Sequence, residues 1–290
     1  MKHLNFFIVI LIFAMLLTAC GGNAAEEMVP ASAEETEEEA SLEEKAAGSL
    51  SIAGSTTVQP VAELLAEAFM VLNPGIEVTV AGGGSSTGVK SVAEGQVEIG
   101  NASREIKDSE MEEHPGLLPH AIAKDGVAVV VHPSNPVSNL TGEQVKAIFL
   151  GQIQNWSEVG GHDKMIIVVV REEGSGTRAT FDELALDEEL PTDFAVVVSS
   201  NGNMVTTVST TEDAIGYVSF GYMDETTRGV VVDGNEPTTD NVVSGAYPIS
   251  RNLNMITMGK AEGLAKLFLD FVLSTEGQAI VVEEGFIAVK

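Results

Sequence analysis

Short aliphatic strands and amphipathic helices alternate along the chain from Gly48 onward. Residues 50–52 and 76–80 have an apolar side chain at every second position, as half-buried strands do. Residues 61–69, between them, keep apolar side chains at helical spacing, and Asn73-Pro74-Gly75 ends that helix. This alternation predicts parallel sheets joined by crossover helices.

The alternation continues through the middle and the end of the chain. Residues 127–131 and 166–170 are aliphatic runs of the buried-strand type. Between them, Thr141 and Gln144 have the spacing of a capping box, which predicts that a helix begins there. A last amphipathic helix is predicted around residues 264–271, and we expect it to pack back onto the first part of the fold.

The N-terminus has the layout of an export signal. Lys2 and His3 precede an unbroken apolar run over residues 4–17, which is too short to span a membrane comfortably. The run ends in Leu17-Thr18-Ala19-Cys20, which resembles a bacterial lipobox. We therefore expect a signal peptide over residues 1–19 and lipidation of the Cys20 sulfur; the alternative is an incidental cysteine after a simple signal.

A tether rich in alanine, glutamate and serine follows the cysteine, over residues 20–47, and contains almost no large apolar residue. It contributes part of the formal net charge of -28, a charge that argues against nucleic-acid binding because phosphate backbones would be repelled. Cys20 is the only cysteine, so no disulfide is available to the exported domain.

Three hydroxyl-rich clusters each lie between the end of a predicted strand and the beginning of a predicted helix. They cover residues 55–57, 85–87 and 175–177. The first turn of a helix offers unpaired N–H groups and a positive dipole end, while serine and threonine add hydroxyl donors. If the three turns meet, they form a site for an oxyanion. Taken singly, each is also explained as an ordinary helix cap beside a glycine turn.

Arg171 stands four residues before Ser175, where it could add a planar, charge-assisted contact to the same anion. The alternative is an ion pair with Glu172 or Glu173.

The motifs around these clusters resemble those of the phosphate-binding subunit of ABC-type phosphate importers, over nearly the whole mature domain. In chain order they are residues 53–60, 84–89, 149–151, 155–156, 171–177, 202–203, 214–218 and 247–249.

The resemblance implies an α/β, two-lobe periplasmic-binding-protein-like fold of type II, in which each lobe is a mixed sheet flanked by helices and the ligand lies in the interlobe cleft. By analogy with the family's double crossover, lobe I comprises residues 48–126 plus 247–290 and lobe II residues 127–246. The implied function is capture of inorganic phosphate and delivery to the membrane permease subunits of an importer. The implied protein is an extracytoplasmic, lipid-anchored monomer that needs no cofactor or metal.

The resemblance also implies a set of phosphate ligands. Carried over position by position, they are Thr56, Thr57, Ser85, Arg171, Ser175, Gly176 and Thr177, with Ser55 and Ser103 in addition. Many family members place an aspartate where this chain has Ser103-Arg104. Arg104 is expected to add positive charge here, and Glu105 or Glu173 is a candidate acceptor for the ligand's proton. A carboxylate acceptor repels fully ionised anions. Because this chain lacks the family's aspartate at that place, sulfate or molybdate stays an alternative ligand.

The sequence also bears on other classes of function. Gly84-Ser85-Ser86-Thr87-Gly88 fits the nucleophile elbow of a serine hydrolase, with Ser86 as nucleophile, but no supporting histidine motif accompanies it. The histidines lack metal-site spacing, and no phosphate-binding loop for ATP occurs. A surface adhesion or sensory lipoprotein that reuses the fold is the third alternative.

Overall fold

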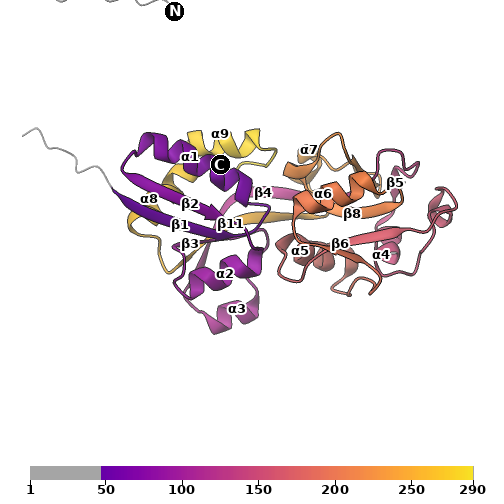
Figure 1. Cartoon of the computed structure of the whole chain (residues 1–290), viewed down its shortest axis with the longest axis horizontal. Helices are drawn as coiled ribbons and strands as arrows, with labels where there is room; N and C mark the ends of the chain where they lie inside the picture. Colours follow the sequence, from indigo (N-terminus) through magenta and orange to yellow (C-terminus); the bar gives the residue numbers. More distant parts are fainter. Residues whose placement is uncertain (1–46, 290) are drawn as a thin grey trace, which may run out of the picture. The chain divides into compact units, whose positions relative to one another are not determined.

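The structure is a computed structural model that describes residues 47–289 (Figure 1). The predicted signal peptide, the Cys20 lipobox and nearly all of the predicted tether lie outside the described residues. Within residues 47–289, none of the helices has the length and apolar character needed to cross a bilayer.

Most strands belong to one mixed sheet with the order β2-β1-β3-β11-β4-β8-β6-β7, and β9 pairs with β4 off this path. The strands are β1 (Gly48–Gly54), β2 (Ile76–Ala81), β3 (Ile99–Ala102), β4 (Leu117–Val131), β5 (Asn139–Leu140), β6 (Ile167–Arg171), β7 (Val196–Val198), β8 (Ala214–Ser219), β9 (Arg228–Gly229), β10 (Val231–Val232) and β11 (Ser250–Met258). Strands β5 and β10 pair separately.

Helices cover both faces of the sheet (Figure 1). They are α1 (Gln59–Leu72), α2 (Ser85–Ala93), α3 (Asp108–Glu113), α4 (Gly142–Phe149), α5 (Gly176–Leu186), α6 (Asn201–Thr210), α7 (Thr239–Val243), α8 (Gly263–Val272) and α9 (Thr275–Glu283), with 3₁₀ turns at Trp156–Val159 and Phe220–Tyr222.

The buried apolar side chains form two large clusters. The first core takes its residues from segments 50–123 and 253–286, and α1, α8 and α9 pack over it. The second core takes its residues from segment 127–249, where Phe149, Phe181 and Tyr217 contact one another. The two cores divide the chain close to the predicted lobe boundaries, which themselves stay a prediction.

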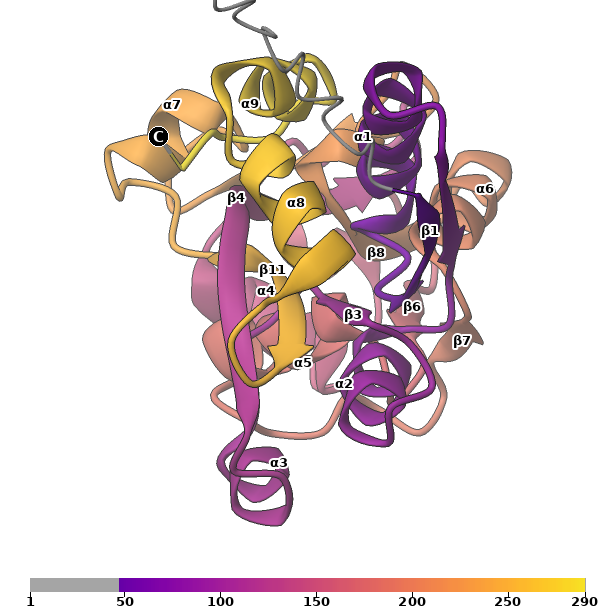
Figure 2. The ribbon, with the colours of Figure 1, turned by 90° about the vertical axis from the view of Figure 1, so that its left-hand side faces the viewer.

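Two strands carry the chain between the cores. β4 pairs with β11 over residues 117–126 and then with β8 over residues 127–131, so one continuous strand serves both halves (Figure 2). The return passes through Ile249, whose carbonyl accepts the Val127 N–H at 2.9 Å, and continues into β11. The two halves of the sheet are therefore connected by adjacent antiparallel strands.

Most of the elements expected from the apolar pattern are confirmed, and their ends differ in informative ways. Thr141 caps α4 and forms the predicted capping box with Gln144. β4 begins at Leu117, well before the predicted residue 127, because its first half is stabilised by pairing with the distant β11. α2 begins at Ser85, so the cluster at residues 85–87 lies in the first turn of that helix, whereas the cluster at residues 55–57 precedes α1, which begins at Gln59.

We expect Phe181→Ala to lower the free energy of unfolding by about 3–5 kcal/mol, because it removes a fully buried ring from the second core. The Phe181 ring stacks on Tyr217 with centroids 4.1 Å apart. Urea unfolding measures the loss. The matched control is Phe194→Ala, whose ring is 92% exposed, and this variant should unfold at nearly the native midpoint. Equal losses in the two variants would contradict the core assignment.

Candidate functional site

The N-termini of α1, α2 and α5 meet where the two cores face each other. Thr57 Oγ1, beside the start of α1, lies 3.1 Å from Thr177 Oγ1 in the first turn of α5. The Ser86 N–H in α2 donates to the Gly174 carbonyl just before α5, at 3.1 Å. Three positive dipole ends are thereby brought together from distant parts of the sequence.

Buried hydroxyls fill the space between these helix ends. Ser55 Oγ donates to Ser103 Oγ at 2.9 Å, and Ser85 Oγ accepts from the Ser103 N–H at 3.0 Å. With the Thr57–Thr177 pair, these side chains form what we call the hydroxyl cluster: Ser55, Thr57, Ser85, Ser103 and Thr177. Each of the five is at most 2% exposed. The cluster concentrates hydroxyl groups that both donate and accept hydrogen bonds.

Gly176 permits the close approach of α5 to this cluster. A Cβ at this position would overlap the Oγ atoms of both Ser85 and Ser103. A glycine is therefore required at this position because α5 approaches the two serine side chains closely, and not because of its backbone conformation.

One of the predicted ligands caps a helix, and another bonds within the turn that precedes a helix. Ser175 Oγ accepts the Arg178 N–H at 3.2 Å as the N-cap of α5, and Ser55 Oγ accepts the Thr57 N–H at 3.1 Å. The simpler explanation, an ordinary helix cap, is thus correct for Ser175 but not for Ser55, because the N-cap of α1 is Val58 and no side chain in the described part of the chain caps that helix.

Arg171 lies at the end of β6 and is 1% exposed. Its Nε and Nη2 each donate to the Glu172 carboxylate at 2.9 Å, and Nη2 also donates to Thr56 Oγ1 at 3.2 Å. Its Nη1 is buried without a hydrogen-bond partner among residues 47–289. Arg171 therefore makes the alternative ion pair with Glu172 and still has a buried donor to offer to a ligand.

Arg104 lies apart from the hydroxyl cluster. Its guanidinium is held by both oxygens of Glu110, at 2.7 and 2.8 Å, and donates to Ser86 Oγ at 3.2 Å. Burial of Glu110 opposes ionisation, but hydrogen bonds from Arg104 and the Lys107 amide outweigh it and lower the pKa of Glu110. The predicted role of Arg104 as a ligand stays a prediction.

The two candidate proton acceptors do not enter the cluster. Glu105 Oε1 accepts from Asn252 Nδ2 at 3.0 Å, and Glu173 is exposed. Glu173 instead lines a cavity of about 490 Å³ that also touches Ser86 and Ser175, and whose other charged residues include Arg178. This cavity adjoins the converging helix ends.

Three contributors were missed by the sequence reasoning. Asn201 Nδ2 donates to Thr57 Oγ1 at 2.8 Å, and the Tyr222 hydroxyl donates to the Thr56 carbonyl at 2.7 Å. Burial raises the pKa of Tyr222 to about 12, so the phenol keeps its proton at neutral pH. The third contributor is Arg251, which also bonds to Thr57. Asn201 directly precedes the Gly202-Asn203 motif, and this neighbourhood was the one sequence signal that could have identified it. Tyr222 and Arg251 lie outside every motif.

Arg251 and Asp125 form a buried ion pair between the two strands that join the cores. Arg251 Nη2 lies 2.8 Å from Asp125 Oδ2 and 3.3 Å from Thr57 Oγ1. Burial raises the pKa of Asp125 and lowers that of Arg251, while the attraction between the two charges opposes both shifts. The pair fixes β4 against β11 beside the hydroxyl cluster.

Ser86, the candidate nucleophile, accepts a hydrogen bond from Arg104 and from no histidine within residues 47–289. His120 bonds to Thr257 and His132 to Ser134. Across the same residues, no group of three or more histidine, cysteine or acidic side chains is placed to hold a metal ion. The arrangement offers buried donors and a guanidinium, which suit the binding of a small oxyanion.

Comparison with known proteins points in the same direction. The family model described as "PBP superfamily domain" matches residues 39–276. The phosphate-binding protein PstS of Bacillus subtilis is 40% identical over 249 residues, which are 85% of this chain and 83% of that protein. PstS of Borreliella burgdorferi is 32% identical over 83% of this chain and 90% of that protein.

Solved structures agree with these relatives. A phosphate ABC transporter substrate-binding protein from Clostridium perfringens, with bound phosphate, is 44% identical with a TM-score of 0.79, covering 84% of this chain and all of that one. An ABC-type phosphate transport receptor from Vibrio cholerae is 36% identical with a TM-score of 0.70, covering 82% of this chain and 99% of that one.

We expect Asp125→Asn to destabilise the protein by about 3–5 kcal/mol, because it leaves the buried Arg251 guanidinium without its counter-charge. Urea unfolding monitored by circular dichroism measures the change. The control is Asp270→Asn, which breaks the exposed Lys266–Asp270 pair on α8 and should alter stability far less. A native-like midpoint for Asp125→Asn would show that the buried pair does not stabilise the fold.

Proposed function

This chain belongs to the PBP superfamily and, within it, to the family of PstS phosphate-binding proteins, and on that premise we propose that it captures inorganic phosphate and delivers it to an ABC importer. The family resemblance and the α/β, periplasmic-binding-protein-like fold class predicted from the sequence are both confirmed by these relatives. The relatives support phosphate as the ligand over sulfate or molybdate. They also support a binding function over a serine-hydrolase activity of Ser86.

The observation that carries the proposal is the convergence of three helix N-termini around one buried cluster of hydroxyls. Arg171 Nη1, a buried donor without a partner among the described residues, supplies the cationic contact. A tetrahedral anion offers enough oxygen lone pairs to accept from amides, hydroxyls and a guanidinium at once.

The proposed ligands are the residues that border this convergence. They are Ser55, Thr56, Thr57, Ser85, Ser103, Arg171, Ser175, Gly176 and Thr177. The Arg104 guanidinium does not contact the hydroxyl cluster itself. It donates to Ser86 Oγ, next to Ser85, and contributes positive charge from that position. About eight hydrogen bonds of ~1 kcal/mol net each would give the ~8 kcal/mol of a micromolar complex.

The two cores correspond in this proposal to the two lobes, with residues 48–126 plus 247–290 in lobe I and residues 127–246 in lobe II. Thr56 and Thr57 from lobe I bond to Arg171, Thr177, Asn201 and Tyr222 from lobe II. A ligand that bonds to both lobes favours their closed arrangement, which the membrane permease subunits of the importer then reopen.

The remaining parts of the proposal concern where the protein acts. We propose that it is an extracytoplasmic, monomeric lipoprotein, anchored to the membrane through Cys20 and held there by the acidic tether. It binds phosphate and performs no catalysis.

We expect calorimetry on the full-length chain, kept in detergent, to show one phosphate bound per chain with a dissociation constant in the micromolar range or below. The physical reason is the number of buried donors at the site. Sulfate and molybdate, titrated under the same conditions, are the comparison ligands. Tighter binding of either anion than of phosphate would overturn the assignment of the ligand.

We expect Arg171→Ala to weaken phosphate binding by about 100-fold, since charge-assisted hydrogen bonds contribute roughly 1.5–3 kcal/mol each. The control is Arg228→Ala, which removes an arginine that bonds to the carbonyls of Asn135 and Val137 in the second core. That variant is expected to lose stability and to keep its phosphate affinity. Native affinity in Arg171→Ala would remove this residue from the ligand set.

A further inference from the structure

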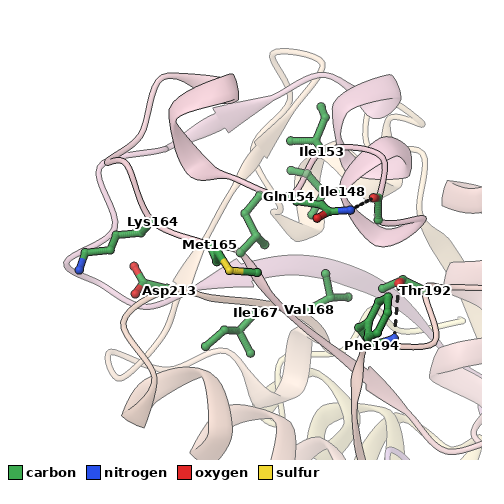
Figure 3. A pocket seen from close by; sticks show the side chains of 12 residues that line it. Ile148, Ile153, Gln154, Lys164, Met165, Ile167, Val168, Thr192, Phe194 and Asp213 are labelled. Atoms are coloured by element: carbon green, nitrogen blue, oxygen red, sulfur yellow. Dashed lines mark hydrogen bonds between the residues drawn. The ribbon is translucent and has the colours of Figure 1, made fainter.

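An apolar groove on the second core lies outside the proposed anion site. It has a volume of about 550 Å³ and lies between the end of α4, the loop after it, the start of β6 and the segment before β7. In Figure 3, Ile148 and Ile153 lie on one side of the strand, Ile167 and Val168 on it, and Phe194 at one end. The volume is in the range of small ligand-binding pockets.

The apolar surface continues out of the groove over the edge of the sheet. Phe194 is 92% exposed and Met165 71%, and Val196 and Val197, which follow Phe194 and belong to β7, are 43% and 59% exposed. β7 is the last strand of the sheet path, so among the described residues one of its edges has no partner strand. Contiguous exposed apolar surface beside an open sheet edge is typical of an interaction site.

The groove and the hydroxyl cluster lie at opposite ends of β6. The strand begins at Ile167 in the groove and ends at Arg171, which is about 13 Å away at ~3.3 Å per residue. An occupant of the groove therefore does not compete with an anion at the cluster.

The charges around the groove are mainly negative. Asp213 lines it, Asp193 stands between the lining residues Thr192 and Phe194, and Glu212 is adjacent and exposed. None of these three carboxylates forms an ion pair with another of the described residues. Lys164 is the one basic residue of the lining, and Figure 3 shows it at the same end as Asp213, opposite Phe194, with its side chain directed away from the groove.

From this combination we infer that the groove and the β7 edge form a docking site for an extended, apolar and positively charged segment of another protein. A second copy of the chain would bring the same acidic rim and be repelled, as would an anionic lipid surface. The exposed Val196 and Val197 of β7 lie outside the cavity lining, so a small molecule in the groove would leave them uncovered. An extended segment can add to the edge of β7 and direct alternate side chains toward the groove.

The test uses two fluorescein-labelled peptides of eight residues, one alternating lysine with valine and one alternating glutamate with valine. Fluorescence anisotropy measures their binding to the full-length chain in nanodiscs of zwitterionic lipid, with empty nanodiscs as blank. We expect the lysine peptide to bind at least tenfold more tightly than the glutamate peptide. Saturating phosphate should leave that affinity unchanged, which separates this site from the anion site.

Variants locate the binding on the surface. Phe194→Ser is expected to weaken the lysine peptide about tenfold, and Asp213→Asn several-fold. The matched controls are Val71→Ser and Glu77→Gln, which remove an exposed apolar and an exposed acidic side chain near the first core and should bind like the native chain.

Three results would overturn the inference. These are no binding of either peptide, equal binding of both, or native affinity in Phe194→Ser. A Phe194-dependent dimer in analytical ultracentrifugation would also overturn it and would identify a second copy as the occupant.

Discussion

Burial of hydrogen-bond donors is the constraint on which this structure depends. Three helices begin at one place, so their first-turn amides point into a region from which water is largely excluded. The hydroxyls of Ser55, Ser85 and Ser103 bond to one another there, and Arg171 keeps one buried nitrogen free of any partner within residues 47–289. Each buried donor left unpaired costs free energy, and this cost is the physical basis of the proposed anion site.

The mixed sheet connects that arrangement to both cores. β4 and β11 run side by side between the two cores, and Asp125 and Arg251 pair across them directly beside Thr57. The strands that join the two cores and the hydroxyl cluster therefore share a contact. Any rearrangement of one core against the other must act on bonds such as those of Tyr222 and Asn201, which reach across to Thr56 and Thr57.

The second core presents two chemically opposite surfaces at the two ends of β6. At its C-terminal end the strand places Arg171 among buried donors, as expected at the carboxyl ends of parallel strands where helices begin. At its N-terminal end it borders an apolar groove edged by carboxylates. The same short strand thus separates a region suited to a small anion from one suited to a cationic, apolar segment.

Local chemistry was enough to predict the elements and the residues of the hydroxyl clusters, because strand alternation, helical spacing and capping depend on near neighbours in the chain. The capping box of Thr141 and Gln144 and the cap formed by Ser175 are examples. Contacts between distant residues decided the rest. Asn201 bonds to Thr57 across 144 positions of sequence, β11 extends β4 back to Leu117, and Arg251 reaches Thr57 across 194 positions. No periodicity or motif encodes such pairings, since they arise only when the folded sheet brings distant segments together.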